Sequence, residues 1–222
     1  MNPKKIAGEK AVQYVEDGMT VGLGTGSTVY FSIIKLGELL KEGLNIKGVP
    51  TSIQTEKLAK DLEIPLVSMS SVDYLDLTID GADEANHDFE LIKGGGGALL
   101  REKMVASISK KFIVVIDESK YVNQLGKFPL PVEIVPFSWE TTLNTIKKLG
   151  CTPKIRSNKN ASPFITDNQN YIADCYFEII DNPAVLNQQL NMIPGVVENG
   201  LFIKMADTIV LGRKNGDVTI MS

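Results

Sequence analysis

Two charged residues flank a run of glycines and are suited to acid–base chemistry. Lys93 precedes glycines 94–97, and Glu102 follows in a segment that predicts a helix. Four glycines in succession cost conformational entropy unless the backbone must approach another group closely. A carboxylate beside such a loop could remove a proton, and the lysine could offset the negative charge that develops. Spacing alone equally allows Glu102 to be an exposed helical residue paired with a neighbouring cation.

Three further carboxylates are concentrated where a predicted strand ends, in the sequence Asp80-Gly81-Ala82-Asp83-Glu84. Such a cluster could hold a metal ion, could bind sugar hydroxyls, or could form a solvated turn, in which Asp and Gly are both favoured. Lys120 ends the segment that follows another predicted strand, and is either a second functional cation or a surface lysine. The residue types alone leave these alternatives open.

A loop rich in glycine and hydroxyl side chains joins a predicted strand to a predicted helix, in the sequence Gly22-Leu23-Gly24-Thr25-Gly26-Ser27-Thr28. The N–H groups of such a loop and of the helix N-terminus bind anions. The loop lacks the GxGxxG pattern of dinucleotide sites and the Gly-Lys-Ser/Thr of Walker A loops. The sequence therefore favours a small phosphate ligand, with a plain glycine turn and N-cap as the alternative. Capping alone explains a second hydroxyl-rich helix start at residues 51–55.

The chain has one histidine and two cysteines, which limits the chemistry that it can perform. A zinc site or a Ser-His-Asp triad is poorly supplied, so catalysis would depend on carboxylates, lysines and backbone amides. Cys151 and Cys175 form no CxxC pair, which favours a reducing compartment over a disulfide between them. We assign no role to His87.

The composition is that of a globular protein with a packed core: of 222 residues, 43% are hydrophobic and 23% charged. The net charge of −4 argues against binding to nucleic acid or to an anionic membrane. The N-terminal segment lacks the apolar region of a signal peptide, and no apolar stretch is long enough to span a bilayer. We expect a cytoplasmic protein that acts on a small molecule, with no nucleic-acid or membrane partner.

Predicted strands and helices alternate through the first half of the chain. Strands are expected at residues 20–23, 46–49, 75–79, 89–92 and 112–116, and helices at 3–16, 29–40, 53–62 and 98–108. This alternation is typical of βαβ units and predicts a mainly parallel, Rossmann-like α/β sheet with helices on both faces. Several loops that carry candidate residues follow strands. Because ligands bind outside the carboxyl ends of such strands, we expect these loops to form a single site.

After about residue 126 the order of elements changes. Residues 127–131 are interpreted as a linker. The next elements are expected as a strand at 132–135, a helix at 139–149, strands at 154–156 and 171–176, a helix at 184–190 and a strand at 196–204, which is the order of a ferredoxin-like unit. Residues 208–211 and 218–221 flank Asn215-Gly216, the signature of a hairpin, which we expect to return to the first sheet. We therefore divide the chain into an α/β catalytic domain, residues 1–126 and 205–222, and a smaller α+β domain, residues 127–204.

Four segments, taken in this order, resemble the ribose-5-phosphate isomerases of the A type. They are residues 24–28, 80–84 and 93–103, and the sequence Gly126-Lys127-Phe128-Pro129-Leu130-Pro131-Val132-Glu133. The resemblance runs nearly end to end, and it implies an aldose–ketose isomerase that interconverts D-ribose 5-phosphate and D-ribulose 5-phosphate in the non-oxidative pentose phosphate pathway. It further implies that no metal or organic cofactor is needed, and that the assembly is a homodimer or a larger even oligomer.

The resemblance also implies roles for the residues at matching positions. Glu102 corresponds to the general base that moves a proton through an ene-diolate, with Asp80 and Lys93 also catalytic. Asp80 and Asp83 would orient hydroxyls and could assist opening of the furanose ring, and Lys4 would help to hold the phosphate. The substrate-binding positions are Lys4, Thr25, Gly26, Ser27, Thr28, Asp80, Gly81, Ala82, Asp83, Lys93, Gly94, Gly95, Gly96 and Lys120.

Three other kinds of protein are alternatives to this one. An amino-sugar-phosphate deaminase or a sugar-phosphate lactonase could use a similar fold, but a deaminase needs a proton shuttle that His87 supplies poorly. A metal-dependent hydride-shift isomerase is disfavoured because the sequence offers no His/Glu ligand set. A non-catalytic phosphosugar sensor is disfavoured because no DNA-binding segment or basic patch accompanies the domain.

Overall fold

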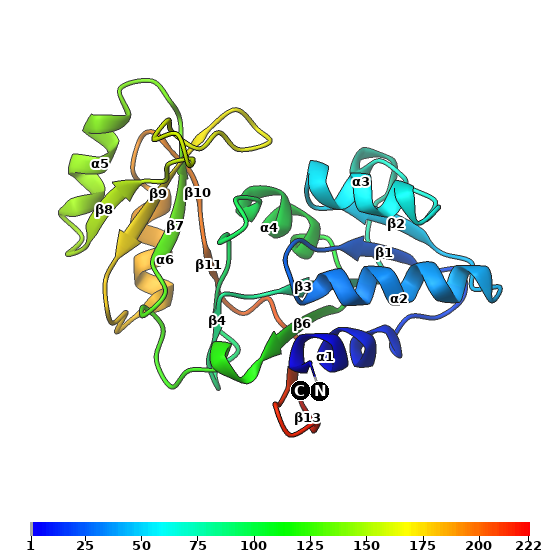
Figure 1. Ribbon diagram of the computed structural model, residues 1–222. Coiled ribbons are helices and arrows are strands. Elements are labelled where there is room, and N and C mark those ends of the chain that lie inside the picture. The colour runs from blue at the N-terminus through cyan, green and yellow to red at the C-terminus, as the bar shows by residue number, and fades with distance from the viewer. Residues whose placement is uncertain (1) are drawn as a thin grey trace. The chain divides into compact units, whose positions relative to one another are not determined.

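A computed structural model describes residues 2–222, which fold into two compact units (Figure 1). The first unit contains the residues up to Ala82, together with Arg101–Tyr121 and Met205–Ser222. The second contains Asp83–Leu100 and Val122–Lys204. Relative to the division expected from the sequence, residues 83–100 and 122–126 lie in the second unit. Residues 83–100 do so because they contain two short strands, one of which pairs with the strand at Leu201–Phe202, and the segment 122–126 joins them through the Val122 N–H, which donates to the Ala85 carbonyl.

The first unit is built on a six-stranded sheet in the order β13-β12-β6-β3-β1-β2, parallel except for β13. Its strands are β1 (Thr20–Leu23), β2 (Lys47–Pro50), β3 (Leu77–Gly81), β6 (Phe112–Asp117), β12 (Thr208–Gly212) and β13 (Val218–Met221). Its helices are α1 (Pro3–Val12), α2 (Val29–Lys41), α3 (Ile53–Asp61) and α4 (Leu99–Ser107, shared at its first residues with the second unit), with 3-10 turns at Met69–Ser71 and Glu118–Lys120. The predicted parallel sheet and the return of the C-terminal hairpin to it are confirmed.

Helices cover both faces of this sheet, with α1 and α2 on one side and α4 on the other (Figure 1). The residues of β1 alternate accordingly: Val21 and Leu23 pack in the core that α1 and α2 contribute to. Gly22 faces the other way, and a Cβ there would lie 2.7 Å from Val105 of α4. All residues of β6 are buried, as expected for a parallel strand with both faces covered.

The order of the strands reverses beside β1. The chain passes from β1 to β2 on one side and then returns to β3 on the other side of β1. Leu23 at the end of β1 is level with Ile79 of β3, so the loop after β1 lies next to Asp80. Ligands of open α/β sheets bind outside the carboxyl ends of the strands at such a reversal.

The second unit combines two antiparallel sheets. A four-stranded sheet has the order β10-β7-β9-β8 and a three-stranded sheet the order β11-β5-β4. The elements are β4 (Glu84–Ala85), β5 (Leu91–Ile92), β7 (Leu130–Ile134), α5 (Trp139–Lys147), β8 (Thr152–Ile155), β9 (Tyr171–Tyr176), α6 (Pro183–Asn191), β10 (Val196–Asn199) and β11 (Leu201–Phe202). From β7 to β10 they follow the predicted ferredoxin-like order, which is confirmed.

Two predictions for this unit are wrong in detail. The segment 127–131 is not simply a linker, because β7 begins at Leu130 and that side chain is buried in the core. The single strand expected at 196–204 is divided at Gly200 between the two sheets. Gly200 N–H donates to the Pro131 carbonyl and its own carbonyl accepts from Lys93 N–H. A Cβ at residue 200 would lie 2.3 Å from the Lys93 oxygen, so only glycine fits there.

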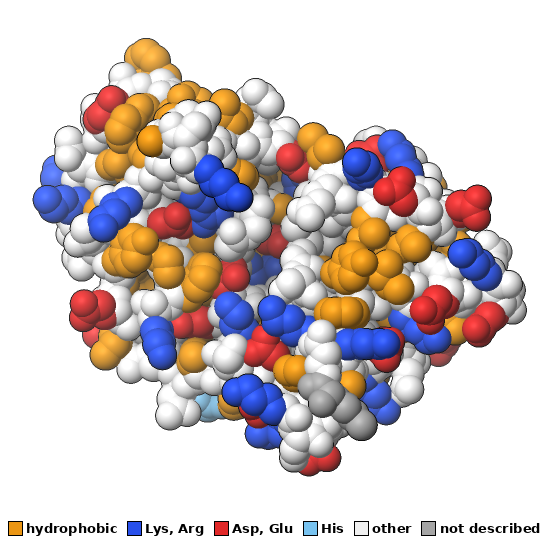
Figure 2. All heavy atoms as spheres, in the orientation of Figure 1, with side chains coloured by type: hydrophobic (Ala, Val, Ile, Leu, Met, Phe, Trp, Pro, Cys, Tyr) orange, Lys and Arg blue, Asp and Glu red, His pale blue; other side chains and the backbone are white. Residues whose placement is uncertain are grey.

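The surface carries mixed charges (Figure 2), and both cysteines are buried. On the face drawn in Figure 2, lysine and arginine side chains are interspersed with aspartate and glutamate. Cys151 and Cys175 are free and buried in the core of the second unit, and the hydrogen bond with Cys151, together with burial, raises the pKa of the Cys175 thiol. Among residues 2–222, no helix is long and apolar enough to cross a membrane.

Candidate active site

Asp80 anchors the glycine- and hydroxyl-rich loop that follows β1. Its carboxylate is fully buried at the end of β3, where Oδ1 accepts the N–H groups of Thr25 (3.0 Å) and Gly81 (2.7 Å). The fit is tight, since a Cβ at Gly24 would lie 2.2 Å from Oδ1 and 2.6 Å from the Asp80 Cα. The structure thus brings Asp80 and the loop together, as the sequence predicted.

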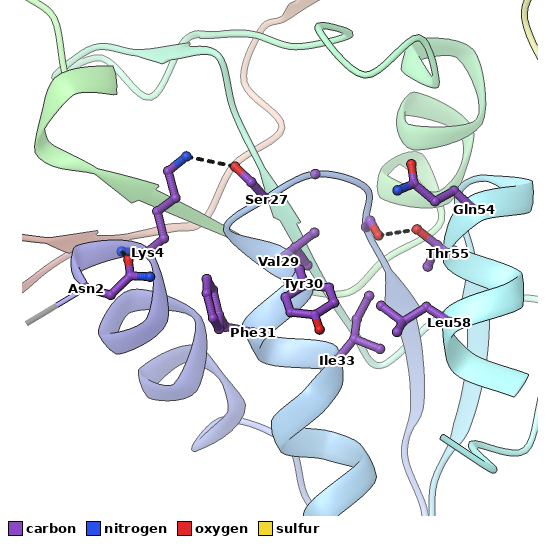
Figure 3. Close-up of a pocket in the computed structure, with 12 residues that line it drawn as sticks. Asn2, Lys4, Ser27, Val29, Tyr30, Phe31, Ile33, Gln54, Thr55 and Leu58 are labelled. Atoms are coloured by element: carbon purple, nitrogen blue, oxygen red, sulfur yellow. Dashed lines mark hydrogen bonds between the residues drawn. The ribbon is translucent and has the colours of Figure 1, made fainter. Parts of the chain in front are cut away.

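A cluster of hydroxyl groups holds the same loop from the side of α3. Thr25 Oγ1 lies 2.8 Å from the hydroxyls of Thr51 and Ser52 and 3.1 Å from that of Thr55. Thr55 in turn donates to the Gly24 carbonyl, a contact drawn in Figure 3. Capping was the predicted role for residues 51–55, and Ser52 does cap α3. Sequence reasoning missed their second role, because the contacts join segments that are distant in sequence.

Lys4 lies at the other end of this loop. Its Nζ donates to Ser27 Oγ at 2.9 Å, from the first turn of α1 to the start of α2 (Figure 3). Gly26 has a φ of +125°, which lets the loop turn into the helix. An ammonium, a hydroxyl and the N-terminus of α2 are therefore gathered where an anion would be favoured.

A cavity of about 500 Å³ adjoins these residues. Its polar lining comes from Lys4, Ser27, Thr55 and others, and its apolar lining from α2 and α3; the full set is Asn2, Lys4, Gly24, Gly26, Ser27, Val29, Tyr30, Phe31, Ile33, Gln54, Thr55 and Leu58. Figure 3 shows Lys4 and Ser27 on one side of the α2 N-terminus and Gln54 and Thr55 on the other. The cavity is large enough for a small ligand.

Glu102 is buried, with a relative exposure of 3%. The alternative that it is an exposed helical residue is therefore wrong. It lies in the first turn of α4, where the helix dipole stabilises a negative charge. A carboxylate withdrawn from water at a helix N-terminus is suited to proton transfer.

Lys120 follows β6 in the 3-10 turn Glu118–Lys120. The Asp117 side chain caps this turn by accepting the Ser119 N–H at 2.9 Å. Because β1, β3 and β6 are parallel neighbours, their carboxyl ends meet at one edge of the sheet. Within the first unit, Lys120 therefore follows the same edge as Asp80 and the loop after β1.

In the second unit, Lys93 begins the glycine loop between β5 and α4. Its side chain is buried, and Nζ lies 5.3 Å from the centre of the Phe202 ring. Two of the glycines have positive φ, +100° at Gly94 and +82° at Gly97, which other residues rarely adopt. Asp83 Oδ2 accepts the Gly95 N–H at 2.7 Å. The loop is thus a fixed structure rather than a flexible tether.

The three carboxylates of the segment 80–84 have separate partners. Asp80 and Asp83 each accept loop N–H groups, whereas Glu84 accepts the N–H groups of Gly126 (2.8 Å) and Phe128 (2.7 Å). Among residues 2–222, no group of three or more His, Cys, Asp or Glu side chains is arranged to hold a metal ion. Glu84 serves to fix the start of the 126–128 segment.

Comparison with known proteins identifies the family. The family model of ribose 5-phosphate isomerase A (phosphoriboisomerase A) matches residues 47–216. A curated ribose-5-phosphate isomerase A from Bacillus mycoides (strain KBAB4) is 58% identical over 97% of this chain and 98% of its own length.

Solved structures agree. A D-ribose-5-phosphate isomerase in complex with phospho-erythronic acid is 42% identical and superimposes with a TM-score of 0.96 over the full length of both chains. Ribose 5-phosphate isomerase A from Methanocaldococcus jannaschii is 42% identical with a TM-score of 0.94, covering 100% of this chain and 98% of its own. With the sequence segments and the fold in agreement, this chain belongs to the ribose-5-phosphate isomerase A family.

Proposed function

We propose that this protein interconverts D-ribose 5-phosphate and D-ribulose 5-phosphate, as a step of the non-oxidative pentose phosphate pathway. Membership of the family supports this reaction, and so do the names of the full-length relatives. The solved relative in complex with phospho-erythronic acid supports a phosphorylated sugar as the class of ligand. The observation that carries the proposal in this chain is the buried carboxylate of Glu102 in the first turn of α4.

Glu102 would act as the base. Ionised in the free enzyme, it would remove the proton from C2 of the open-chain aldose and return a proton to C1, so that the electrons pass through an ene-diolate. The hydroxyl proton moves from O2 to O1 in the same conversion. One carboxylate therefore suffices for the carbon-bound proton, and the reaction needs no electron acceptor.

Positive charge and N–H donors would stabilise the ene-diolate. Lys93 would offset the charge on the developing oxyanion together with the amides of Gly94 and Gly96, while the Gly95 N–H stays bound to Asp83. Burial of the lysine supports this role, because the interaction of an ammonium with an oxyanion is stronger away from water.

The remaining residues would hold the substrate. Lys4, Ser27 and Thr28 would bind the phosphate with the loop amide of Gly26, which is supported by the Lys4–Ser27 contact at the α2 N-terminus, and Thr25 would hold the loop through Asp80. Binding energy from this non-reacting phosphate would position the reacting carbons. The residues proposed to orient the sugar hydroxyls are Asp80, Gly81, Ala82, Asp83 and Lys120.

The test is isomerisation of D-ribose 5-phosphate by the purified protein in excess EDTA. Glu102→Gln should lower kcat roughly 10²–10⁴-fold, the usual contribution of a general base, and leave KM nearly unchanged. Glu56→Gln is the matched control, since Glu56 also lies in a first helical turn, but its side chain is 41% exposed and paired with Lys60. It should retain wild-type turnover.

Other outcomes would select other functions. Loss of all turnover on adding EDTA would favour the metal-dependent hydride shift. Binding of ribose 5-phosphate without turnover by the wild type would favour a sensor, and no binding would remove the substrate assignment. A deaminase is poorly supported, because the only histidine, His87, is exposed beside Asp88.

We also propose that the protein is cytoplasmic, as its composition led us to expect, and that it forms a homodimer or a larger even oligomer, as the resemblance to the family implied. Light scattering coupled to size-exclusion chromatography would test the assembly. A mass of one chain across the micromolar range would contradict it.

A further inference from the structure

An arginine that the sequence did not single out grips the glycine loop. Arg156 lies just beyond β8, and its Nη1 donates to the carbonyls of Gly94 at 2.9 Å and Gly95 at 3.1 Å. All three residues belong to the second unit. Because Arg156 is distant from the loop in sequence, only the fold reveals the contact.

Arg156 is itself held in place. Its Nε and Nη2 donate to the two carboxylate oxygens of Asp174 at 2.9 and 2.5 Å, a bidentate pair with side-chain exposures of 16% and 17%. Its N–H donates to the Ile172 carbonyl, which extends the ladder of β8 against β9. Bidentate pairs of this kind fix the plane of the guanidinium, which a lysine ammonium cannot do.

An aromatic ring completes the support. The Phe164 ring centre lies 5.9 Å from the guanidinium carbon of Arg156. The same ring fills the space beside Gly97, where a Cβ would lie 2.6 Å from two of its carbon atoms. The guanidinium and the ring therefore contact the loop at two points.

The contacts determine how two peptide units of the loop are oriented. In the Gly94–Gly95 unit, Arg156 binds the carbonyl and Asp83 binds the N–H, so this peptide plane is held at both ends. In the Gly95–Gly96 unit, Arg156 binds the carbonyl. A trans peptide directs its N–H opposite to its carbonyl, so the Gly96 N–H points away from the arginine.

We propose that Arg156, fixed by Asp174, is a positioning residue for the isomerisation, holding the glycine loop so that the Gly96 N–H keeps one direction as a donor to the developing oxyanion. The inference rests on the proposed function, in which the loop amides stabilise the ene-diolate. A loop of four glycines has no side chains of its own to restrict it, and its freedom would otherwise have to be lost in each turnover. In this proposal Arg156 and Asp174 act through the peptide groups of the loop and not on the substrate.

The test compares Arg156→Ala and Arg156→Lys with Lys154→Met, which removes one exposed positive charge from the adjoining strand β8. Both Arg156 variants should lower kcat roughly 10–10²-fold, the scale expected when a catalytic group is misplaced by about 1 Å. Lys154→Met should behave as wild type. Added ethylguanidinium should restore part of the turnover of Arg156→Ala, whereas ethylammonium should not.

Hydrogen exchange separates positioning from a general structural role. In Arg156→Ala, amide exchange should accelerate at least tenfold in the segment that contains residues 94–97, with β9 and α6 protected as in the wild type. A kcat within twofold of wild type, or equal loss of protection throughout the second unit, would overturn the proposal. A wild type without isomerase activity would instead refute the proposed function, and loop exchange would still decide whether Arg156 fixes the loop.

Discussion

The two glycine-bearing loops of this protein are held in different ways. The loop after β1 carries side chains that anchor it: Thr25 joins a hydroxyl cluster with Thr51, Ser52 and Thr55. The loop after Lys93 has no side chains, and is gripped through its peptide groups by Asp83 and Arg156. Each loop nevertheless has one aspartate from the segment 80–84 that accepts a loop N–H, Asp80 in the first and Asp83 in the second.

This difference indicates what each loop is built for. In the first loop the hydroxyl groups bind Thr25, so the N-terminus of α2 and Lys4 remain available to an anion. A tightly packed loop of this kind is suited to a phosphate group that takes no part in the reaction. A bare backbone allows close approach to reacting atoms, but its direction must be imposed from outside. The first loop should therefore respond to mutation mainly in stability and phosphate affinity, and the second mainly in turnover.

The largest expected effect on stability comes from adding a methyl group to each loop. Gly24→Ala would place Cβ 2.6 Å from the Asp80 Cα, so backbone must move, whereas at Gly95 the close atoms belong only to the Asp83 side chain. We expect Gly24→Ala to lower the free energy of unfolding by about 3 kcal/mol and Gly95→Ala by about 1 kcal/mol. Urea denaturation measures both values.

The isomerase activity of Gly24→Ala and Gly95→Ala provides a second test of the difference between the two loops. Gly95→Ala should lose more turnover than stability, because it disturbs the Asp83 contact that directs the loop. Equal losses of stability in the two variants would break the distinction between a packed loop and a directed one.

The next largest effect on the free energy of unfolding is expected from removing the hydroxyl group of Thr25. Thr25→Val keeps the shape of the side chain but removes its hydrogen bonds to the hydroxyls of Thr51, Ser52 and Thr55, each of which keeps another partner. The loss of these buried hydrogen bonds should lower the free energy of unfolding by roughly 1 kcal/mol. Thr152→Val, at an exposed position of β8, is the control and should change stability by less than about 0.5 kcal/mol. Similar values for the two valine variants would show that the cluster does not hold the loop.

The smallest effect on stability is expected at Lys4. Its contact with Ser27 is exposed, so Lys4→Met should alter the free energy of unfolding by less than about 0.5 kcal/mol. If Lys4 binds the phosphate, KM for ribose 5-phosphate should rise roughly tenfold or more while kcat changes little, as for a lost charge-assisted hydrogen bond. Steady-state kinetics at constant ionic strength measures the split. A fall in kcat at unchanged KM would contradict this role.

Sequence reasoning located the elements of the first unit closely because each has a strong local signal. The strand at 20–23 was predicted with its observed bounds, and the hairpin around Asn215-Gly216 was expected in its observed sheet. It failed at residues 127–131, where the prolines suggest a linker but Leu130 begins β7. It also failed at 196–204, where the local pattern suggests one continuous strand but pairing with distant segments divides it at Gly200. The role of Gly200 depends on Pro131 and Lys93.

The sequence by itself predicted the βαβ alternation and the ferredoxin-like order, because these depend on local periodicity and turn chemistry, and its resemblance to a known family proposed the candidate residues. Only the tertiary structure decided that Glu102 is buried, that residues 51–55 brace the first loop and that Arg156 and Asp174 direct the second. The physical reason is that burial and hydrogen bonding join segments distant in sequence. The local sequence around a helical glutamate or a strand-end arginine does not predict which groups its side chain will contact in the folded chain.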